Sequence, residues 1–168
     1  DFKKYEITVE TEQAEEFSIC LRIPDWIMSE ARVYVNEELA AQTEKTDAFV
    51  TIARAWSKGD KIVLIFPIGV RFVPLPDDET MGAFRYGAEA LAGITAQERI
   101  LYIESDNPAD ELSVDTERQW GDFRTFYRTE NQDPGISFCR VNDIGYEPYQ
   151  IYFKIKKRNN AIGGKDQV

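Results

Sequence analysis

The chain has no histidine among its 168 residues and only two cysteines. Without histidine, Ser-His and Cys-His nucleophilic schemes and His-ligated zinc sites are excluded. Two cysteines cannot build a Cys₄ or Cys₃ zinc site. A glycine-rich phosphate loop of the expected form is also missing. The residues themselves therefore give no catalytic, cofactor-binding or metal-binding assignment.

Long apolar runs and an excess of positive charge are also lacking. No run approaches the roughly 20 residues that a membrane helix needs, and no targeting segment is visible. The formal net charge of −10 disfavours binding to nucleic acid or to an anionic membrane. We therefore expect a soluble chain with neither partner. The compartment of the parent protein, whether cytoplasmic or periplasmic and secreted, stays open.

Alternating apolar residues run through the first half of the chain. From Phe17 to Ile23 every second residue is apolar, so a strand there turns one face inward. Pro24 cannot donate to a ladder, and it ends this strand or places it at an edge. Further strands are predicted at 33–35, 49–54 and 61–66. The pattern predicts an antiparallel all-β fold, with a core between sheets that contains Leu21, Ile23, Val35, Ile52, Val63 and Ile65.

The second half also has strand-like segments, at 99–103, 136–141 and 149–155. Residues 88–92 favour a helix by propensity, but Gly87 and Gly93 leave too little length for a stable one, so we expect a strand. The proline-rich and acidic stretch 74–79 is the best candidate linker. We expect a β-sandwich, jelly-roll-like or made of two small packed β modules. Its parts are a module at 1–75, a second β-rich segment at 76–156 and a flexible tail at 157–168.

Three motifs in the first half lie in a recognisable order. Residues 17–26 read FSICLRIPDW, residues 33–36 read VYVN, and residues 54–67 read RAWSKGDKIVLIFP. Their order and spacing resemble the β-sandwich region that follows the catalytic domain in glycoside hydrolase family 127, the β-L-arabinofuranosidase-like enzymes. The chain departs from the family pattern at Glu37, which replaces the usual glycine after Asn36, so a type I′ turn there is less secure.

Two later segments are similar to the same family. Residues 86–93 resemble its Y-G-P-x-x-L-A-G segment, with Ala88 in place of proline. Residues 147–152 resemble a P-x-Y-x-I-H stretch, with Tyr152 where histidine is common. The likeness thus implies that the chain is the C-terminal β-sandwich region of such a protein.

The resemblance implies that the catalytic site lies elsewhere in the parent. In the family it sits in an upstream helical barrel, with a cysteine nucleophile on a zinc site built from cysteines and a glutamate. This chain opens in strand-like sequence at 5–9, so we expect no catalytic residue, cofactor or metal in it. The expected role is an accessory region that supports the catalytic barrel, the rim of the cleft or a dimer interface. The expected partners are the upstream catalytic domain, a second copy of the chain and a glycan.

Two other functions stay open, a carbohydrate-binding module and a structural or interaction domain without sugar binding. Trp120, Tyr127 and Tyr149 are the candidate residues for contact with a sugar or a neighbouring domain, since their segments lie outside the best-matched strands. Trp26 and Trp56 lie at strand ends, where packing in a core or interface is the ordinary role.

Acidic clusters are the only candidates for a carboxylate pair. A glycosidase pair needs two carboxyls about 5 to 9.5 Å apart across a cleft, and adjacency in sequence does not supply that. We interpret the clusters as solvated loops, and the oxygen ligands at 106–110 as a turn rather than a calcium site. The clusters are Asp77-Asp78-Glu79, Asp106 with Asp110 and Glu111, and Asp115 with Glu117.

Cys20 and Cys139 are predicted to be separate reduced thiols, because a chain of this size already supports a core. A disulfide between them is the alternative. Cys20 is expected to face away from the apolar side of its strand.

Overall fold

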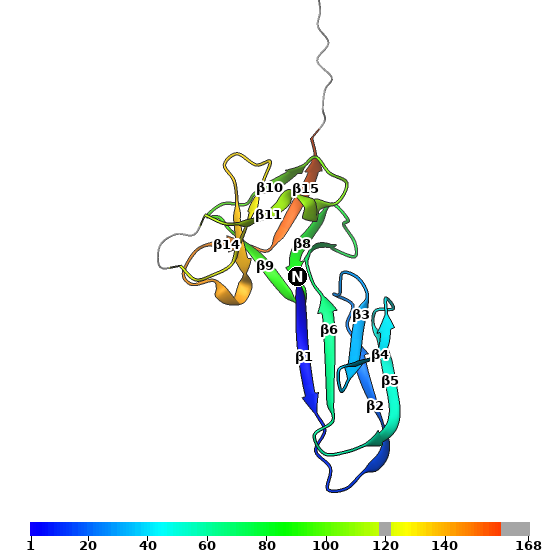
Figure 1. The fold of residues 1–168 in the computed structure, drawn as a ribbon. Helices are drawn as coiled ribbons and strands as arrows, with labels where there is room; N and C mark the ends of the chain where they lie inside the picture. Colours follow the sequence, from blue (N-terminus) through cyan, green and yellow to red (C-terminus); the bar gives the residue numbers. More distant parts are fainter. Residues whose placement is uncertain (118–121, 159–168) are drawn as a thin grey trace, which may run out of the picture. The chain divides into compact units, whose positions relative to one another are not determined.

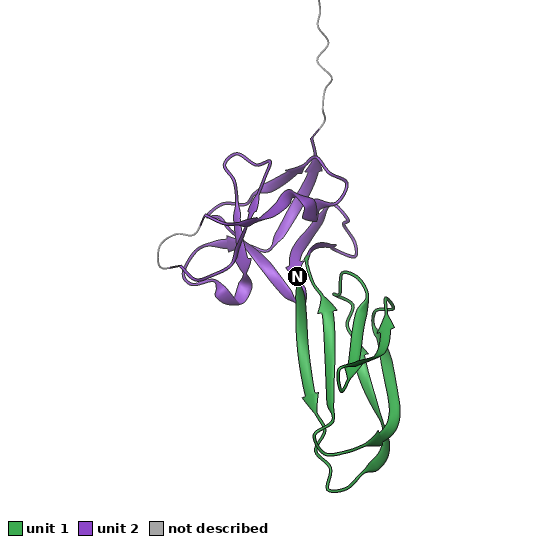
Figure 2. Ribbon diagram, in the orientation of Figure 1, with its two compact units in different colours: residues 1–69 green, residues 70–168 purple. Residues whose placement is uncertain are grey.

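A computed structural model of the chain describes residues 1–117 and 122–158. The predicted fold class is confirmed, since strands make up most of the elements and nearly all their pairs are antiparallel. The chain divides into two compact units, Asp1–Gly69 and Val70–Val168 (Figure 2). Within the described residues, no helix is long and apolar enough to cross a membrane.

Unit 1 contains two sheets (Figure 1). In the larger sheet the strand order is β1-β6-β3-β4, and in the smaller one β2 pairs with β5. All these pairs are antiparallel. The strands are β1 (Phe2–Thr8), β2 (Glu15–Ile23), β3 (Ala31–Val35), β4 (Glu38–Thr43), β5 (Ala48–Trp56) and β6 (Lys61–Pro67).

The core of unit 1 is mainly aliphatic and contains Leu21, Ile23 and Val35 as predicted. The prediction for β6 is wrong, because Ile62, Leu64 and Phe66 are buried there while Val63 and Ile65 are only half-buried. A continuous apolar run has no alternation to say which face is inside. The register decides it, since Val63 and Ile65 lie beside Tyr34 and Arg32 on the outer face of the sheet. Ile52 is half-buried and packs against this core, as predicted.

The hairpin between β3 and β4 has a type I′ turn, although Glu37 stands where the family usually has glycine. Asn36 and Glu37 have φ values of 49° and 71°, and such positive values at both central positions belong to a type I′ turn. Asparagine tolerates this conformation, but a glutamate is strained in it. The rest of the hairpin must therefore hold Glu37 in place.

The described residues of unit 2 form one sheet of nine strands. The main path is β10-β15-β8-β9-β13-β12-β11, with β7 added to β8 and β14 added to β9; β10 and β15 are parallel. The strands are β7 (Val70–Pro74), β8 (Met81–Tyr86), β9 (Glu89–Ile94), β10 (Ile100–Ile103), β11 (Leu112–Asp115), β12 (Phe126–Thr129), β13 (Ser137–Arg140), β14 (Tyr149–Gln150) and β15 (Tyr152–Lys157). Two short 3₁₀ turns, η1 (Pro108–Glu111) and η2 (Val141–Asp143), complete it.

The units divide after Gly69, earlier than the boundary near residue 75 expected from the sequence. The reason is that β7 pairs with β8 along its whole length, from Val70 beside Tyr86 to Pro74 beside Gly82. The segment 74–79 is thus the connection between two strands of unit 2.

Phenylalanine rings fill the centre of unit 2. Phe84, Phe138 and Phe153 are fully buried, and their ring centroids lie 5.1 to 6.4 Å apart. The strand predicted at residues 88–92 is present as β9. Its Gly93 lies against the phenylalanine rings. A Cβ at Gly93 would come within 2.6 Å of Phe153, so the rings leave no room there for a side chain. Gly87 takes a φ of 58° in the turn before β9.

Candidate functional site

The residues of the recognised motifs in unit 1 have structural roles. The Asn36 amide donates to the Asp60 carboxylate at 2.8 Å and accepts the Lys61 N–H at 2.9 Å. Asp60 also accepts the Ser57 N–H at 2.9 Å, while Gly59 supplies the turn with a φ of 89°. The hydrogen bond from the Ser57 N–H lowers the pKa of Asp60 the most, and the one from the Asn36 amide lowers it further. The network joins the β3–β4 turn to the β5–β6 turn.

Trp56 has an equally structural setting. Its ring is fully buried, and its indole N–H donates to the Phe17 carbonyl at 3.0 Å. The Arg54 guanidinium lies over the ring at 5.2 Å. Trp26 meets Phe66 edge to face at 5.7 Å. Both tryptophans thus pack within unit 1, the ordinary role expected for them.

One cavity in unit 2 lies around Arg124. It is a cavity of about 340 Å³, which falls in the size range of small-molecule sites. Carboxylates dominate its polar lining, beside one arginine and one aromatic ring. The lining residues are Ile94, Asp115, Glu117, Asp122, Arg124, Phe126, Gly135, Ser137 and Glu147.

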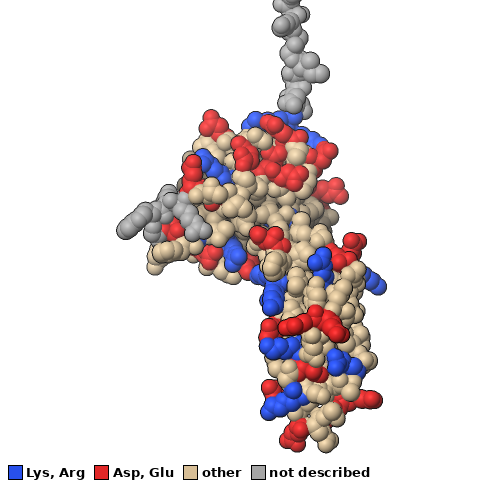
Figure 3. Space-filling model, in the orientation of Figure 1, with Lys and Arg blue, Asp and Glu red and all other residues tan. Residues whose placement is uncertain are grey.

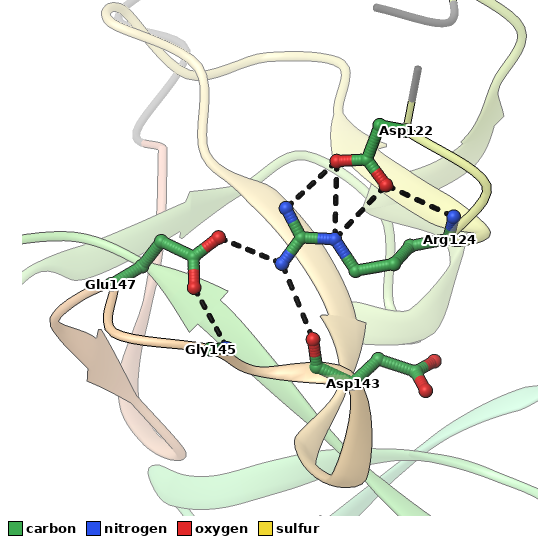
Figure 4. Close-up of polar contacts among 5 residues, drawn as sticks. All are labelled: Asp122, Arg124, Asp143, Gly145 and Glu147. Carbon is green, nitrogen blue, oxygen red and sulfur yellow. Dashed lines mark hydrogen bonds and ion pairs between the residues drawn. The ribbon is translucent and has the colours of Figure 1, made fainter.

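Arg124 holds two acidic side chains that come from different loops (Figure 4). Its Nε and Nη2 donate to Asp122 at 3.1 and 2.7 Å. Its Nη1 donates to the Glu147 carboxylate at 2.7 Å and to the Asp143 carbonyl at 3.2 Å. The second Glu147 oxygen accepts the Gly145 N–H at 2.8 Å. Arginine has five N–H donors, so only one is left for anything else.

These contacts fix the charge of the three groups. Hydrogen bonds from Arg124 lower the pKa of Asp122, and a backbone N–H together with Arg124 lowers the pKa of Glu147. The two carboxylates in turn raise the pKa of Arg124. A glycosidase acid needs the opposite, a carboxyl whose pKa is raised so that it carries a proton at working pH. The arrangement is therefore an ionised clasp between two loops.

The remaining lining residues include one of the predicted carboxylate pairs. Asp115 accepts the Glu117 N–H at 2.9 Å, as in an Asx turn, and Glu117 lies 3.7 Å from Arg128. Phe126 lies under the Arg124 guanidinium at 4.9 Å. Asp115 and Glu117 thus lie beside a cavity, although the sequence indicated only a solvated loop.

Two of the three predicted contact residues, Tyr127 and Tyr149, lie in the described part of the chain, and their settings differ. Trp120 lies outside the described residues. Tyr127 is buried with its ring 5.6 Å from Tyr86, so it does not offer a face to the surface. Tyr149 is 48% exposed and lines an open groove of about 500 Å³ together with Tyr152, which is 55% exposed. Of the three, only Tyr149 is described as a surface aromatic.

The other acidic clusters form turns or surface ion pairs. Asp78 accepts the N–H and hydroxyl of Thr80, and Asp106 pairs with Lys157. Asn107 caps the turn η1 and donates to Asp110. Among the described residues, no group of three or more acidic or cysteine side chains is placed to hold a metal ion.

Glu111 is the one acidic side chain in this set that is buried, at 4% exposure. Burial by itself would raise its pKa, but the N–H groups of Ser105 and Glu104 and the Asn131 amide donate to the carboxylate, and its pKa is lowered overall. The one local signal for this burial is that Glu111 precedes the apolar Leu112. The carboxylate thus accepts hydrogen bonds from the backbone of the segment between β10 and η1 and from Asn131.

Both cysteines are free, as predicted. Cys20 is exposed and lies on the outer face of β2, opposite Thr51 of β5. Cys139 is buried, and burial raises the pKa of its thiol. Cys139 therefore lacks the exposed, low-pKa setting of a reactive cysteine.

A match to a known protein family lies within unit 1. Residues 2–68 match the family model "Beta-L-arabinofuranosidase, GH127 middle domain". The C-terminal assignment made from the sequence is not confirmed, since the match is to a middle domain and ends at residue 68. No curated protein matches the chain.

Solved GH127 structures share the fold over most of the chain. One is a GH127 beta-L-arabinofuranosidase from Geobacillus stearothermophilus T6, with a TM-score of 0.63 at 16% identity over 91% of this chain and 28% of that one. A structure titled "Glycoside hydrolase" gives 0.62 at 16% identity over 90% and 30%. A GH127 beta-arabinofuranosidase gives 0.58 at 15% identity over 91% and 30%. The chain thus spans less than a third of these proteins.

Proposed function

We propose that the chain is a non-catalytic accessory region of a β-L-arabinofuranosidase-like glycoside hydrolase. The observation that carries this proposal is the match of residues 2–68 to the GH127 middle domain. Unit 1 would be that middle domain. Unit 2 would follow it as the C-terminal part, since the fold similarity extends over about nine-tenths of the chain.

The chemistry of the Arg124 cavity supports a non-catalytic role. Asp122 and Glu147 are ion-paired with Arg124 at 2.7 Å, and their lowered pKa values leave neither one protonated at neutral pH. Hydrolysis of a glycoside by a carboxyl pair requires a protonated acid. Neither Asp122 nor Glu147 therefore offers the protonated acid that this mechanism uses.

The role of the region would be mechanical. It would support the catalytic barrel of the parent enzyme, the rim of its cleft or a dimer interface. Its partner would be the catalytic domain, which would carry the zinc and the nucleophile. The motif residues in unit 1 agree with this role, because their hydrogen bonds link turns of the sandwich to each other.

An assay of the purified chain tests the proposal. We expect no turnover of a panel of nitrophenyl glycosides that includes arabinofuranosides, with or without added zinc. In parallel, removal of this region from the parent enzyme should reduce its soluble yield and its melting temperature. Turnover by the chain alone that is lost on mutating one carboxylate of the cavity would overturn the proposal.

A carbohydrate-binding role is the second candidate, and the surface aromatics favour it. Tyr149 and Tyr152 present half-exposed rings at one groove of unit 2. Titration of the chain with plant cell-wall oligosaccharides by calorimetry tests this role, with Tyr149→Ala as the variant. Tyr102→Ala, which changes an equally exposed tyrosine outside the groove, is the matched control. Binding that Tyr149→Ala abolishes and Tyr102→Ala keeps would favour the module.

A further inference from the structure

One face of the sheet in unit 2 carries basic side chains and no acidic ones on four of its strands. Phe72 and Phe84 mark the opposite, buried face, where their rings lie 5.2 Å apart. Because side chains alternate along a strand, Arg71 and Arg85 point away from these rings. On their face β7, β8, β9 and β15, whose residues are all described, place four basic side chains and no carboxylate. The basic residues are Arg71, Arg85, Lys154 and Lys156.

Arg71 and Arg85 lie directly opposite each other in the antiparallel pair of β7 and β8. Side chains in such positions are neighbours, with Cβ atoms about 4.5 to 5.5 Å apart, and like charges there are unfavourable. On its other side Arg85 lies beside Ala90 of β9, whose methyl group carries no charge and fills little space. Arg71 also has interactions of its own. The two arginines thus concentrate positive charge at one point of a chain whose net charge is −10.

The hydrogen bonding of the half-buried Arg85 is incomplete. Its Nη2 donates to the Ala88 carbonyl at 2.6 Å, but its Nε is buried and has no acceptor. No carboxylate in the described part of the chain forms an ion pair with it. A buried N–H without an acceptor is unfavourable and indicates a missing partner. Other arginines of unit 2 do have carboxylate partners, namely Arg124, Arg128, Arg140 and Arg158.

The missing partner can be named by its chemistry. A guanidinium presents its N–H groups in a planar fork that matches the paired oxygens of a carboxylate or a phosphate. Arg85 uses one of its five N–H groups on Ala88. An oxyanion beside Arg85 would accept from the others, and its negative charge would offset the repulsion between the two arginines.

We propose that Arg85, with Arg71 beside it, forms a binding site for a small oxyanion, a phosphate or carboxylate group, on the face of β7 and β8 opposite Phe72 and Phe84. The oxyanion accepts hydrogen bonds from the Arg85 guanidinium, and the short side chain of Ala90 leaves space for it. Without the ion, Arg85 does not stabilise the fold, because it faces a like charge and holds a buried N–H without an acceptor. The proposal goes beyond the accessory role and does not rest on the family match.

Inorganic phosphate tests the site, with chloride at equal ionic strength as the reference because salt screens charges in general. A ligand that binds only the folded chain raises its melting temperature. We expect about 20 mM phosphate to raise the melting temperature of the native chain by at least about 3 °C over chloride. Arg85→Gln should lose most of this shift. The matched control is Arg128→Gln, which removes the same charge from an exposed arginine of β12 and should keep the shift.

The melts in chloride separate a binding role of Arg85 from a structural one. Arg85→Gln removes a like charge opposite Arg71, so without phosphate it should melt no lower than the native chain. Arg85→Lys keeps the charge but loses the planar fork, and calorimetry should show at least about tenfold weaker phosphate binding.

Two results would overturn the proposal. The first is an equal phosphate shift in the native chain and in Arg85→Gln, including no shift in either, since phosphate also stabilises folded chains by exclusion from their surface. The second is a clear fall in the melting temperature of Arg85→Gln in chloride, which would give Arg85 a structural role.

Discussion

Unit 1 has an aliphatic core with its charges at the surface, whereas unit 2 encloses an ionised glutamate beside a centre of phenylalanine rings. The buried polar side chains among the described residues, Glu111 and Thr129, both belong to unit 2. On the face that Figure 3 draws, the surface charges differ as well, with acidic side chains gathered on unit 2 and both signs interspersed on unit 1.

The difference concerns how each unit holds its loops. In unit 1 the Asn36–Asp60 network links exposed turns and adds to a core that is already complete. In unit 2 the loops close on charges, with Glu111 under the β10–β11 connection and Arg124 between the loops of Asp122 and Glu147. Removing a charge should therefore harm unit 2 more than unit 1.

The largest expected effect is that of Glu111→Ala. The substitution leaves two backbone N–H groups and the Asn131 amide without their acceptor in a buried loop. We expect a loss of about 3 kcal/mol of stability in unit 2. Hydrogen exchange should show faster opening at residues 104–112, with unit 1 unchanged. The control is Glu130→Ala, at an exposed neighbouring side chain. An equal loss of stability from both variants would mean that the buried charge of Glu111 is not what holds unit 2.

Acid should distinguish the units next. Glu111, Asp122 and Glu147 have pKa values below their ordinary values of 4.5, 3.8 and 4.5. The unfolded chain then binds protons more readily, so the stability these groups contribute is complete above about pH 4.5 and is lost as pH falls through the lowered values. We expect the melting temperature of unit 2 to fall below about pH 4.5 ahead of that of unit 1.

Arg124→Gln serves as the control for this acid effect. Without the guanidinium, the pKa values of Asp122 and Glu147 should return toward ordinary ones, so the variant should start less stable and lose less on acidification. An unchanged acid response would mean that the clasp does not hold unit 2.

A smaller effect is expected at the turn network of unit 1. Asn36→Ala removes the amide that joins Asp60 to the Lys61 N–H, and it places an alanine at a φ of 49°. We expect a loss of about 1 to 2 kcal/mol, measured by urea denaturation. Gln42→Ala, at an exposed position of β4, should cost much less. A loss as large as that of Glu111→Ala would remove the contrast between the units.

The smallest effect has the opposite sign. Glu37→Gly relieves a non-glycine residue at a φ of 71°, so unit 1 should gain about 0.5 to 1 kcal/mol. Glu38→Gly, one residue later and inside β4, should instead destabilise. Urea denaturation of the two variants checks the signs, and a loss from Glu37→Gly would mean that the glutamate side chain contributes to the turn.

The sequence by itself determined the strands whose signal is local. The alternation from Phe17 to Ile23 gave β2, Gly59 gave the turn before β6, and the short interval between Gly87 and Gly93 excluded a helix at β9. These features depend on neighbours within a few residues, and period and φ preferences act over that range.

Only the tertiary structure decided the rest. An apolar run such as β6 has no preferred face until strands lie on both sides of it, so Ile62 and Leu64 became the core in place of Val63 and Ile65. Arg124 finds Glu147 twenty-three residues further along the chain, and the buried Glu111 carboxylate accepts a hydrogen bond from the Asn131 amide, twenty residues further along. Such contacts form between residues that the chain brings together only on folding, so a single sequence contains no local trace of them.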